Sequence, residues 1–82
     1  MNKRDGLTPA EEVTRERMRQ LAKWGEQNHD PLYGLAIFVE EVGEVGKAAC
    51  ERDWAGYRTE LIHAAAVAIS AIASFDRNGA PQ

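Results

Sequence analysis

The sequence of 82 residues has few cysteines, few aromatic residues and no long apolar run. Its one cysteine, Cys50, excludes a disulfide framework and favours a reducing, cytoplasmic compartment. Residues 1–7 carry basic side chains but no apolar run after them, so we expect no signal peptide. The longest apolar run, 64–73, is interrupted by Ser70 and has about half the length of a bilayer span. We therefore expect no membrane partner.

The sequence also lacks an excess of positive charge. Its 10 lysine and arginine residues stand against 13 acidic residues, which gives a net charge of −3. A protein that binds nucleic acid polymers is normally basic, so a small DNA-binding regulator is disfavoured. A small phosphate ligand is still allowed, because a divalent cation reverses the sign of an acidic site.

Three segments have the composition of helices and begin with helix-capping residues, and none shows the alternating pattern of a strand. The first opens with a capping box and a proline, and the other two follow an aspartate. The N-terminal caps are expected at Thr8, Asp30 and Asp53, and the three helices are expected to end at about Trp24, Glu51 and Arg77. We predict an all-α protein with a single helical domain over 8–77 and flexible ends at 1–7 and 78–82.

The second predicted helix is amphipathic. Its acidic side holds three glutamates, and its apolar face consists of Leu35, Phe38, Val42, Val45 and Ala49. Gly43 and Gly46 each cost a helix about 1 kcal/mol relative to alanine, which indicates that another backbone approaches closely there.

The third predicted helix is apolar on nearly every side between residues 61 and 75. Such a helix must be covered all round, and two other short helices of one chain cannot do that. We predict a homodimer or a larger even assembly in which this helix packs against its own copy.

The acidic residues carry the clearest chemical signal. Glu40, Glu41 and Glu44 alone are compatible with a solvated helix face. Glu60 is different, because it heads an otherwise apolar stripe, where a carboxylate needs a cationic partner or a metal ion. Arg58, Lys47 or a bound ion would serve. A carboxylate site without cysteine favours Mg²⁺, with Mn²⁺ as the alternative.

The pattern Glu40-Glu41-x-x-Glu44, fifteen residues, then Glu60-x-x-His63 resembles the MazG-like nucleotide pyrophosphohydrolases. Segments 19–29 and 42–48 support the resemblance, which covers about residues 15–76. It implies a dimeric or tetrameric helical bundle of the all-α NTP pyrophosphatase type. It also implies hydrolysis of a (d)NTP to the (d)NMP and pyrophosphate, with house-cleaning of the nucleotide pool as the family role.

The resemblance implies a role for each matching acid. Glu41, Glu44 and Glu60 would hold Mg²⁺, and Glu40 would be catalytic, as a further ligand or as a base that orients water. His63 stands where the family has an aspartate. Histidine is a poorer ligand for Mg²⁺, so His63 would bind a phosphate oxygen or accept Mn²⁺. The alternative is a non-catalytic helical module that binds nucleotides or a protein through a degraded metal site.

The end of the first predicted helix supplies the other candidates for substrate binding. Lys23 would bind a phosphate, Trp24 would stack on the base or sugar, and Gln27 would bind a base edge. Equally, Trp24 is typical of a core anchor and Lys23 of a surface residue. One arginine of this helix would reach the triphosphate, and the sequence does not identify it.

Overall fold

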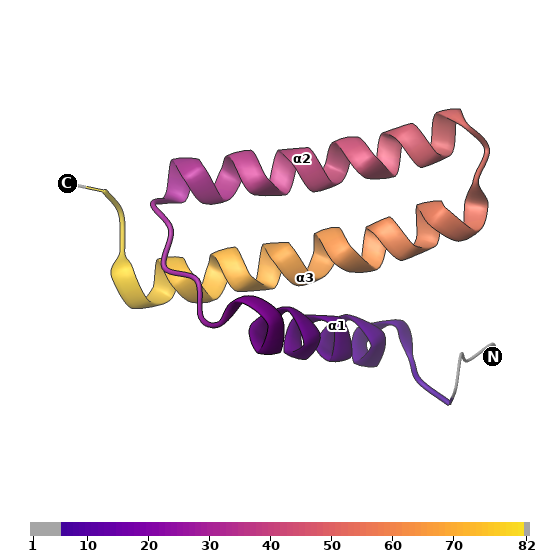
Figure 1. Cartoon of the computed structure of the whole chain (residues 1–82). Helices are drawn as coiled ribbons and strands as arrows, with labels where there is room; N and C mark the ends of the chain where they lie inside the picture. Colours follow the sequence, from indigo (N-terminus) through magenta and orange to yellow (C-terminus); the bar gives the residue numbers. More distant parts are fainter. Residues whose placement is uncertain (1–5, 82) are drawn as a thin grey trace.

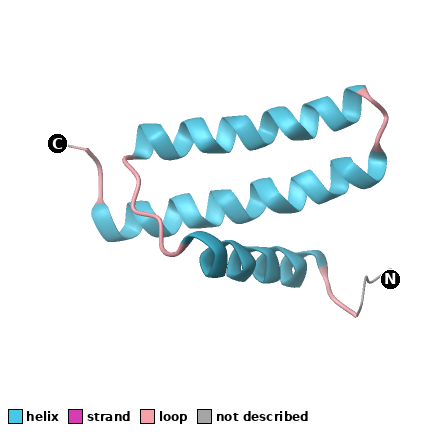
Figure 2. Cartoon of the chain, viewed as in Figure 1, coloured by secondary structure: helices cyan, strands magenta, loops and turns pink. Residues whose placement is uncertain are grey.

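The computed structural model describes residues 6–81, which form three helices and no strand (Figures 1 and 2). They are α1 (Pro9–Trp24), α2 (Pro31–Cys50) and α3 (Trp54–Asn78). The all-α class is confirmed, and the predicted helix ends agree to within one residue. The ends predicted to be flexible lie partly outside the described residues, at 1–5 and 82. Asn78 belongs to α3, and its side-chain amide donates to the carbonyl of Ser74.

The capping box at the start of α1 is formed as the sequence predicts. The Thr8 hydroxyl accepts a hydrogen bond from the Glu11 backbone N–H, and the Glu11 carboxylate accepts one from the Thr8 N–H at 2.8 Å. That second bond lowers the pKa of Glu11 below its ordinary value. Two backbone donors at the helix end are therefore satisfied locally.

Removal of this cap gives a first test of the fold. Thr8→Ala is expected to lower the free energy of unfolding by about 1 kcal/mol, because the hydroxyl acceptor is lost. Thr8→Ser keeps the acceptor and should stay close to wild type. Urea denaturation followed by circular dichroism compares the variants, and equal stability of all three proteins would contradict the role given to Thr8.

The helices are arranged around α3, which lies between the other two (Figure 1). Both α1 and α2 pack on α3, and they make no close backbone approach to each other. A bidentate ion pair joins the Arg58 guanidinium on α3 to the Glu12 carboxylate on α1, with contacts of 2.6 and 3.0 Å. The protomer therefore has a hollow between α1 and α2 with α3 as its floor.

The loop between α1 and α2 is fastened to the end of α3. The Arg77 guanidinium donates to the Gln27 carbonyl at 2.9 Å and to the Asn28 side chain at 3.0 Å. The Ser74 hydroxyl donates to the His29 carbonyl at 3.3 Å. These bonds close the hollow at the end that is formed by residues 25–30.

The inward face of α2 differs from the predicted apolar face. Ala48 is its one buried residue, while Leu35 and Val42 are 55% and 47% exposed. Glu41 turns inward with Ala48, although it was predicted on the opposite, acidic side. The reason is that α2 has α3 as its single neighbour, and one helix covers a narrower arc than the apolar residues of α2 occupy.

The prediction of a close backbone approach at Gly43 and Gly46 is wrong within the protomer. No described atom lies within 4 Å of the position that a Cβ would take at either glycine. Both glycines are exposed, on the open side of α2.

Helix α3 is only partly covered. Its buried residues are all small, namely Ala64, Ala66 and Ser74. Its large apolar side chains remain exposed, among them Leu61, Ile69, Ile72 and Phe75. By length and composition alone α3 could cross a membrane, but the core helix of a soluble protein passes the same test. The absence of a membrane partner and the cytoplasmic location stay predictions.

Candidate metal centre and groove

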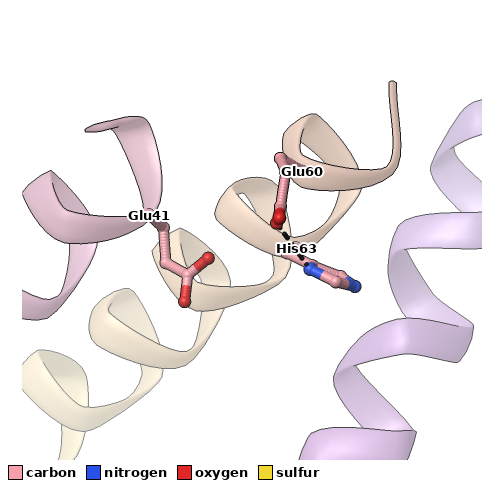
Figure 3. A group of neighbouring side chains, drawn as sticks. All are labelled: Glu41, Glu60 and His63. Carbon is pink, nitrogen blue, oxygen red and sulfur yellow. Dashed lines mark hydrogen bonds and ion pairs between the residues drawn. The ribbon is translucent and has the colours of Figure 1, made fainter. Parts of the chain in front are cut away.

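Three side chains from two helices meet near the middle of the protomer. Glu41 projects from α2 toward α3, where Glu60 and His63 lie one turn apart (Figure 3). One ligand atom from each lies within 4.8 Å of the other two. We call Glu41, Glu60 and His63 the acidic cluster. The sequence placed these residues on neighbouring helices, and the structure brings them together.

His63 lies between carboxylates of two helices. Its Nδ1 is 2.9 Å from Glu60 Oε1, the interaction drawn as a dashed line in Figure 3. Its Nε2 is 3.8 Å from Oε2 of Glu16 on α1. The first distance is that of a hydrogen bond and the second that of a looser ionic contact. An imidazolium would serve both carboxylates, so His63 can partly offset the negative charge without a metal ion.

The electrostatics of Glu41 show that the cluster is short of positive charge. Burial raises the pKa of the Glu41 carboxyl, and the negative charge of Glu60 raises it further. Glu40 and Glu44 add smaller increases, while His63 acts in the opposite direction. Arg58, one of the three cations considered for Glu60, binds Glu12 instead.

The donor set suits a divalent cation. Two carboxylates and an imidazole are ligands of Mn²⁺ and other transition ions, whereas Mg²⁺ prefers oxygen alone. Neighbouring ligands in an octahedron around such an ion are about 3 Å apart. The observed spacing of up to 4.8 Å is wider, so modest side-chain rotations would complete the site. A bound cation would also supply the positive charge that Glu41 lacks.

The other two predicted acids do not join the cluster. Glu40 and Glu44 lie on α2 beside Glu41, but both side chains are exposed. Neither belongs to the group of ligand atoms that converge within 4.8 Å. In the protomer they act on Glu41 through charge, and their roles as base and ligand stay predictions.

The hollow between α1 and α2 is a groove of about 750 Å³. Glu41 and His63 lie on its wall, and its floor is formed by Val67, Ser70, Ala71 and Ser74 of α3. Such a volume is within the range of about 300–1,000 Å³ that is usual for small-molecule sites. The acidic cluster is thus joined to a space that is large enough for a ligand.

Three of the four predicted substrate residues line this groove, namely Trp24, Gln27 and the His63 described above. Trp24 is 56% exposed, so in the protomer it is no core anchor. Gln27 also lines the groove, and its amide donates to the Trp24 carbonyl at 3.0 Å. Lys23 is exposed outside the groove lining, with its ammonium 4.8 Å from the centre of the Trp24 ring. The structure therefore supports Trp24 better than Lys23 as a ligand contact.

Sequence reasoning did not single out Glu16, and it left open which arginine of α1 would reach the triphosphate. Glu16 and Arg17 are both half-buried and line the groove. The Arg19 guanidinium donates to Glu16 at 2.7 and 2.8 Å and lowers the pKa of that carboxyl. Their positions on the same helix face as Val13 and Gln20 were a usable signal that these charges point inward.

No protein-family model, curated protein or solved structure matches this chain. The site is therefore interpreted from its own geometry, together with the resemblance of the acidic motif.

Proposed function

We propose that this chain is a divalent-metal-dependent nucleoside triphosphate pyrophosphohydrolase that cleaves a (d)NTP to the (d)NMP and pyrophosphate. One observation carries the proposal: Glu41 and Glu60, from two helices, converge with His63, and two members of this cluster, Glu41 and His63, line the groove. The acidic motif that resembles the MazG-like enzymes contributes two of its four glutamates to this point. House-cleaning of the nucleotide pool is the role that fits this activity.

The reaction transfers a phosphoryl group to water. The water oxygen bonds to the α phosphorus and gives up a proton to solvent or to a basic group of the site, the bond from that phosphorus to the oxygen that bridges the α and β phosphates breaks, and pyrophosphate leaves with that oxygen. A divalent ion held by the cluster would neutralise the triphosphate and the charge that develops on the leaving group. Glu41 and Glu60 would hold that ion. Glu16, close to His63 Nε2, would fix the orientation of the imidazole.

The direct test is an assay of pyrophosphate release from mixed dNTPs with Mn²⁺ or Mg²⁺. The proposal expects release with Mn²⁺ and weaker release with Mg²⁺, because His63 is one of three ligands. A protein without release under either condition would not be this enzyme.

A second function is favoured by the hydrogen bond between His63 and Glu60. This contact of 2.9 Å pairs the Glu60 carboxylate with His63 without any metal ion. In that case the chain would be a non-catalytic module that binds nucleotides in the groove. Thermal stabilisation by a nucleotide without pyrophosphate release would support this alternative.

His63→Asp separates the two roles of the histidine. The variant should bind Mg²⁺ more tightly and show more turnover with Mg²⁺, because it restores an oxygen ligand. In metal-free buffer its free energy of unfolding should fall by about 1–2 kcal/mol, because the partly exposed imidazole that contacts Glu16 and Glu60 is replaced by a third acid. Calorimetric titration with Mg²⁺ and urea denaturation in EDTA measure these effects. Equal Mg²⁺ affinity in both proteins would contradict the assignment of His63 as a metal ligand.

We further propose that the protein works as a homodimer or a larger even assembly. A folded monomer of 9.1 kDa is expected to expose about 4,900 Å². This protomer exposes 5907 Å², and no large side chain among the described residues is fully buried. The excess of about 1,000 Å² is comparable to the share of one subunit in a standard interface, about 800 Å².

A further inference from the structure

Arg17 is an arginine on the groove wall whose charge has no partner within residues 6–81. Its Nε is buried and makes no hydrogen bond within residues 6–81. Arg19, the other arginine that lines the groove, is held by two hydrogen bonds to Glu16. Among the described residues, Arg17 has neither an ion pair nor a hydrogen bond from its side chain.

A half-buried guanidinium without an acceptor destabilises the protein that carries it. The groove lining includes apolar side chains such as Leu21 and Phe38, and its carboxylates, Glu16 and Glu41, make no ion pair with Arg17. Nothing in the packing requires a cation at this position. The terminal nitrogens of Arg17, unlike its Nε, are not buried without a partner, so they are the atoms that would bind an anion in the groove.

The position of Arg17 along the groove indicates which part of a ligand it would meet. It follows Glu16, which contacts His63, and it precedes Trp24 by seven residues on the same face of α1. Seven residues correspond to about 10 Å along the helix axis. Arg17 therefore lies between the acidic cluster and the aromatic end of the groove.

We infer that Arg17 is the phosphate-binding residue of the groove. Its guanidinium binds the phosphates on the side away from the acidic cluster, and the nucleoside extends toward Trp24. The identification of the anion as a nucleotide phosphate rests on the proposed function. Binding of a polyphosphate by Arg17 does not, because it follows from the unpaired charge and its place in the groove.

A second hollow provides a competing anion site. It has a volume of about 460 Å³ and is lined by Arg15, Arg19 and Arg58. Two of these arginines are already paired, with Glu16 and Glu12 respectively. Arg15 is the cation to test there, and it provides the matched control for Arg17 because the two lie on the same helix.

The test is calorimetric titration of the full chain with inorganic tripolyphosphate, with and without Mn²⁺. Arg17→Met should weaken binding about tenfold to a hundredfold, the range for one charge-assisted hydrogen bond. Arg17→Lys should fall between, since it keeps the charge but loses the planar fork. Arg15→Met should bind as wild type does. Arg17→Met without ligand should melt no lower than wild type, because an unsatisfied donor is removed.

Three results would overturn the inference. They are no binding by wild type, wild-type affinity in Arg17→Met, and a loss of affinity in Arg15→Met instead. Pyrophosphate release from dNTPs is measured in parallel. If wild type binds tripolyphosphate through Arg17 but releases no pyrophosphate, the enzymatic proposal fails and this inference stands.

Discussion

Glu41→Gln and Glu60→Gln are each expected to lower pyrophosphate release by more than about a hundredfold. Loss of groups that merely orient metal ligands already costs about 10–100-fold in metal affinity or activity, and these two residues are the proposed ligands themselves. The substitution keeps the shape of the side chain and removes its charge. Release is measured with dNTPs at saturating Mn²⁺, and Mn²⁺ affinity is measured separately by titration.

Other glutamates on α2 provide the controls. Glu51→Gln changes an exposed residue at the end of the helix and should leave release unchanged. Glu44→Gln should cost far less than Glu41→Gln, because Glu44 lies outside the acidic cluster in the protomer. If Glu44→Gln were as damaging as Glu41→Gln, the ligand set predicted from the sequence would be right and the one given by the protomer incomplete.

Glu41→Gln is expected to have the opposite effect, stabilising the protein, when no metal is bound. Burial and the charge of Glu60 raise the pKa of Glu41 above 4.5, so the folded state binds this proton more tightly than the unfolded state does. The free energy of unfolding therefore falls as pH rises from 4.5 through the raised pKa. Glu41→Gln removes this loss and should be more stable than wild type in EDTA at neutral pH. A less stable variant would contradict an unfavourable charge at Glu41.

Val39→Glu and Ile69→Glu are expected to convert the assembly into monomers that have lost much of their helical structure. Both side chains are exposed in the protomer, by 57% and 41%, and neither lines the groove. On a true monomer surface such changes would alter stability by less than about 0.5 kcal/mol. In an interface each would bury an unpaired carboxylate, which is strongly unfavourable.

Sedimentation velocity and circular dichroism measure the two consequences. Ala22→Glu places the same charge on the exposed side of α1 and should leave the assembly intact. The two positions also show which helix forms the interface, since Val39 lies on α2 and Ile69 on α3. A stable wild-type monomer, or variants that sediment as wild type does, would remove the basis for the homodimer.

The helix limits were predictable because their signals are local. Thr8, Asp30 and Asp53 accept hydrogen bonds from the first turns of the three helices, as their place in the sequence indicates. Such contacts join residues two or three positions apart and do not depend on the rest of the fold. The face of α2 that packs inward could not be predicted in the same way, because it depends on which neighbour covers the helix.

The candidate site likewise combines contacts that local sequence predicts with contacts that depend on how the helices pack. Glu60 and His63 are one helical turn apart, so their proximity follows from the sequence. Glu16 joins them from α1, more than forty residues away, and Arg17 lines the groove because α1 packs on α3 at one particular rotation. No local pattern fixes that rotation.

The sequence by itself determined three helices, their ends, an apolar third helix and an acidic motif that suggests metal and phosphate chemistry. The tertiary structure decided that Glu41 turns inward while Glu40 and Glu44 remain exposed, and that α1 and α2 flank α3 with a groove between them. The physical reason is that helix formation depends on contacts within a few residues. The convergence of side chains depends on how whole helices bury their faces against one another.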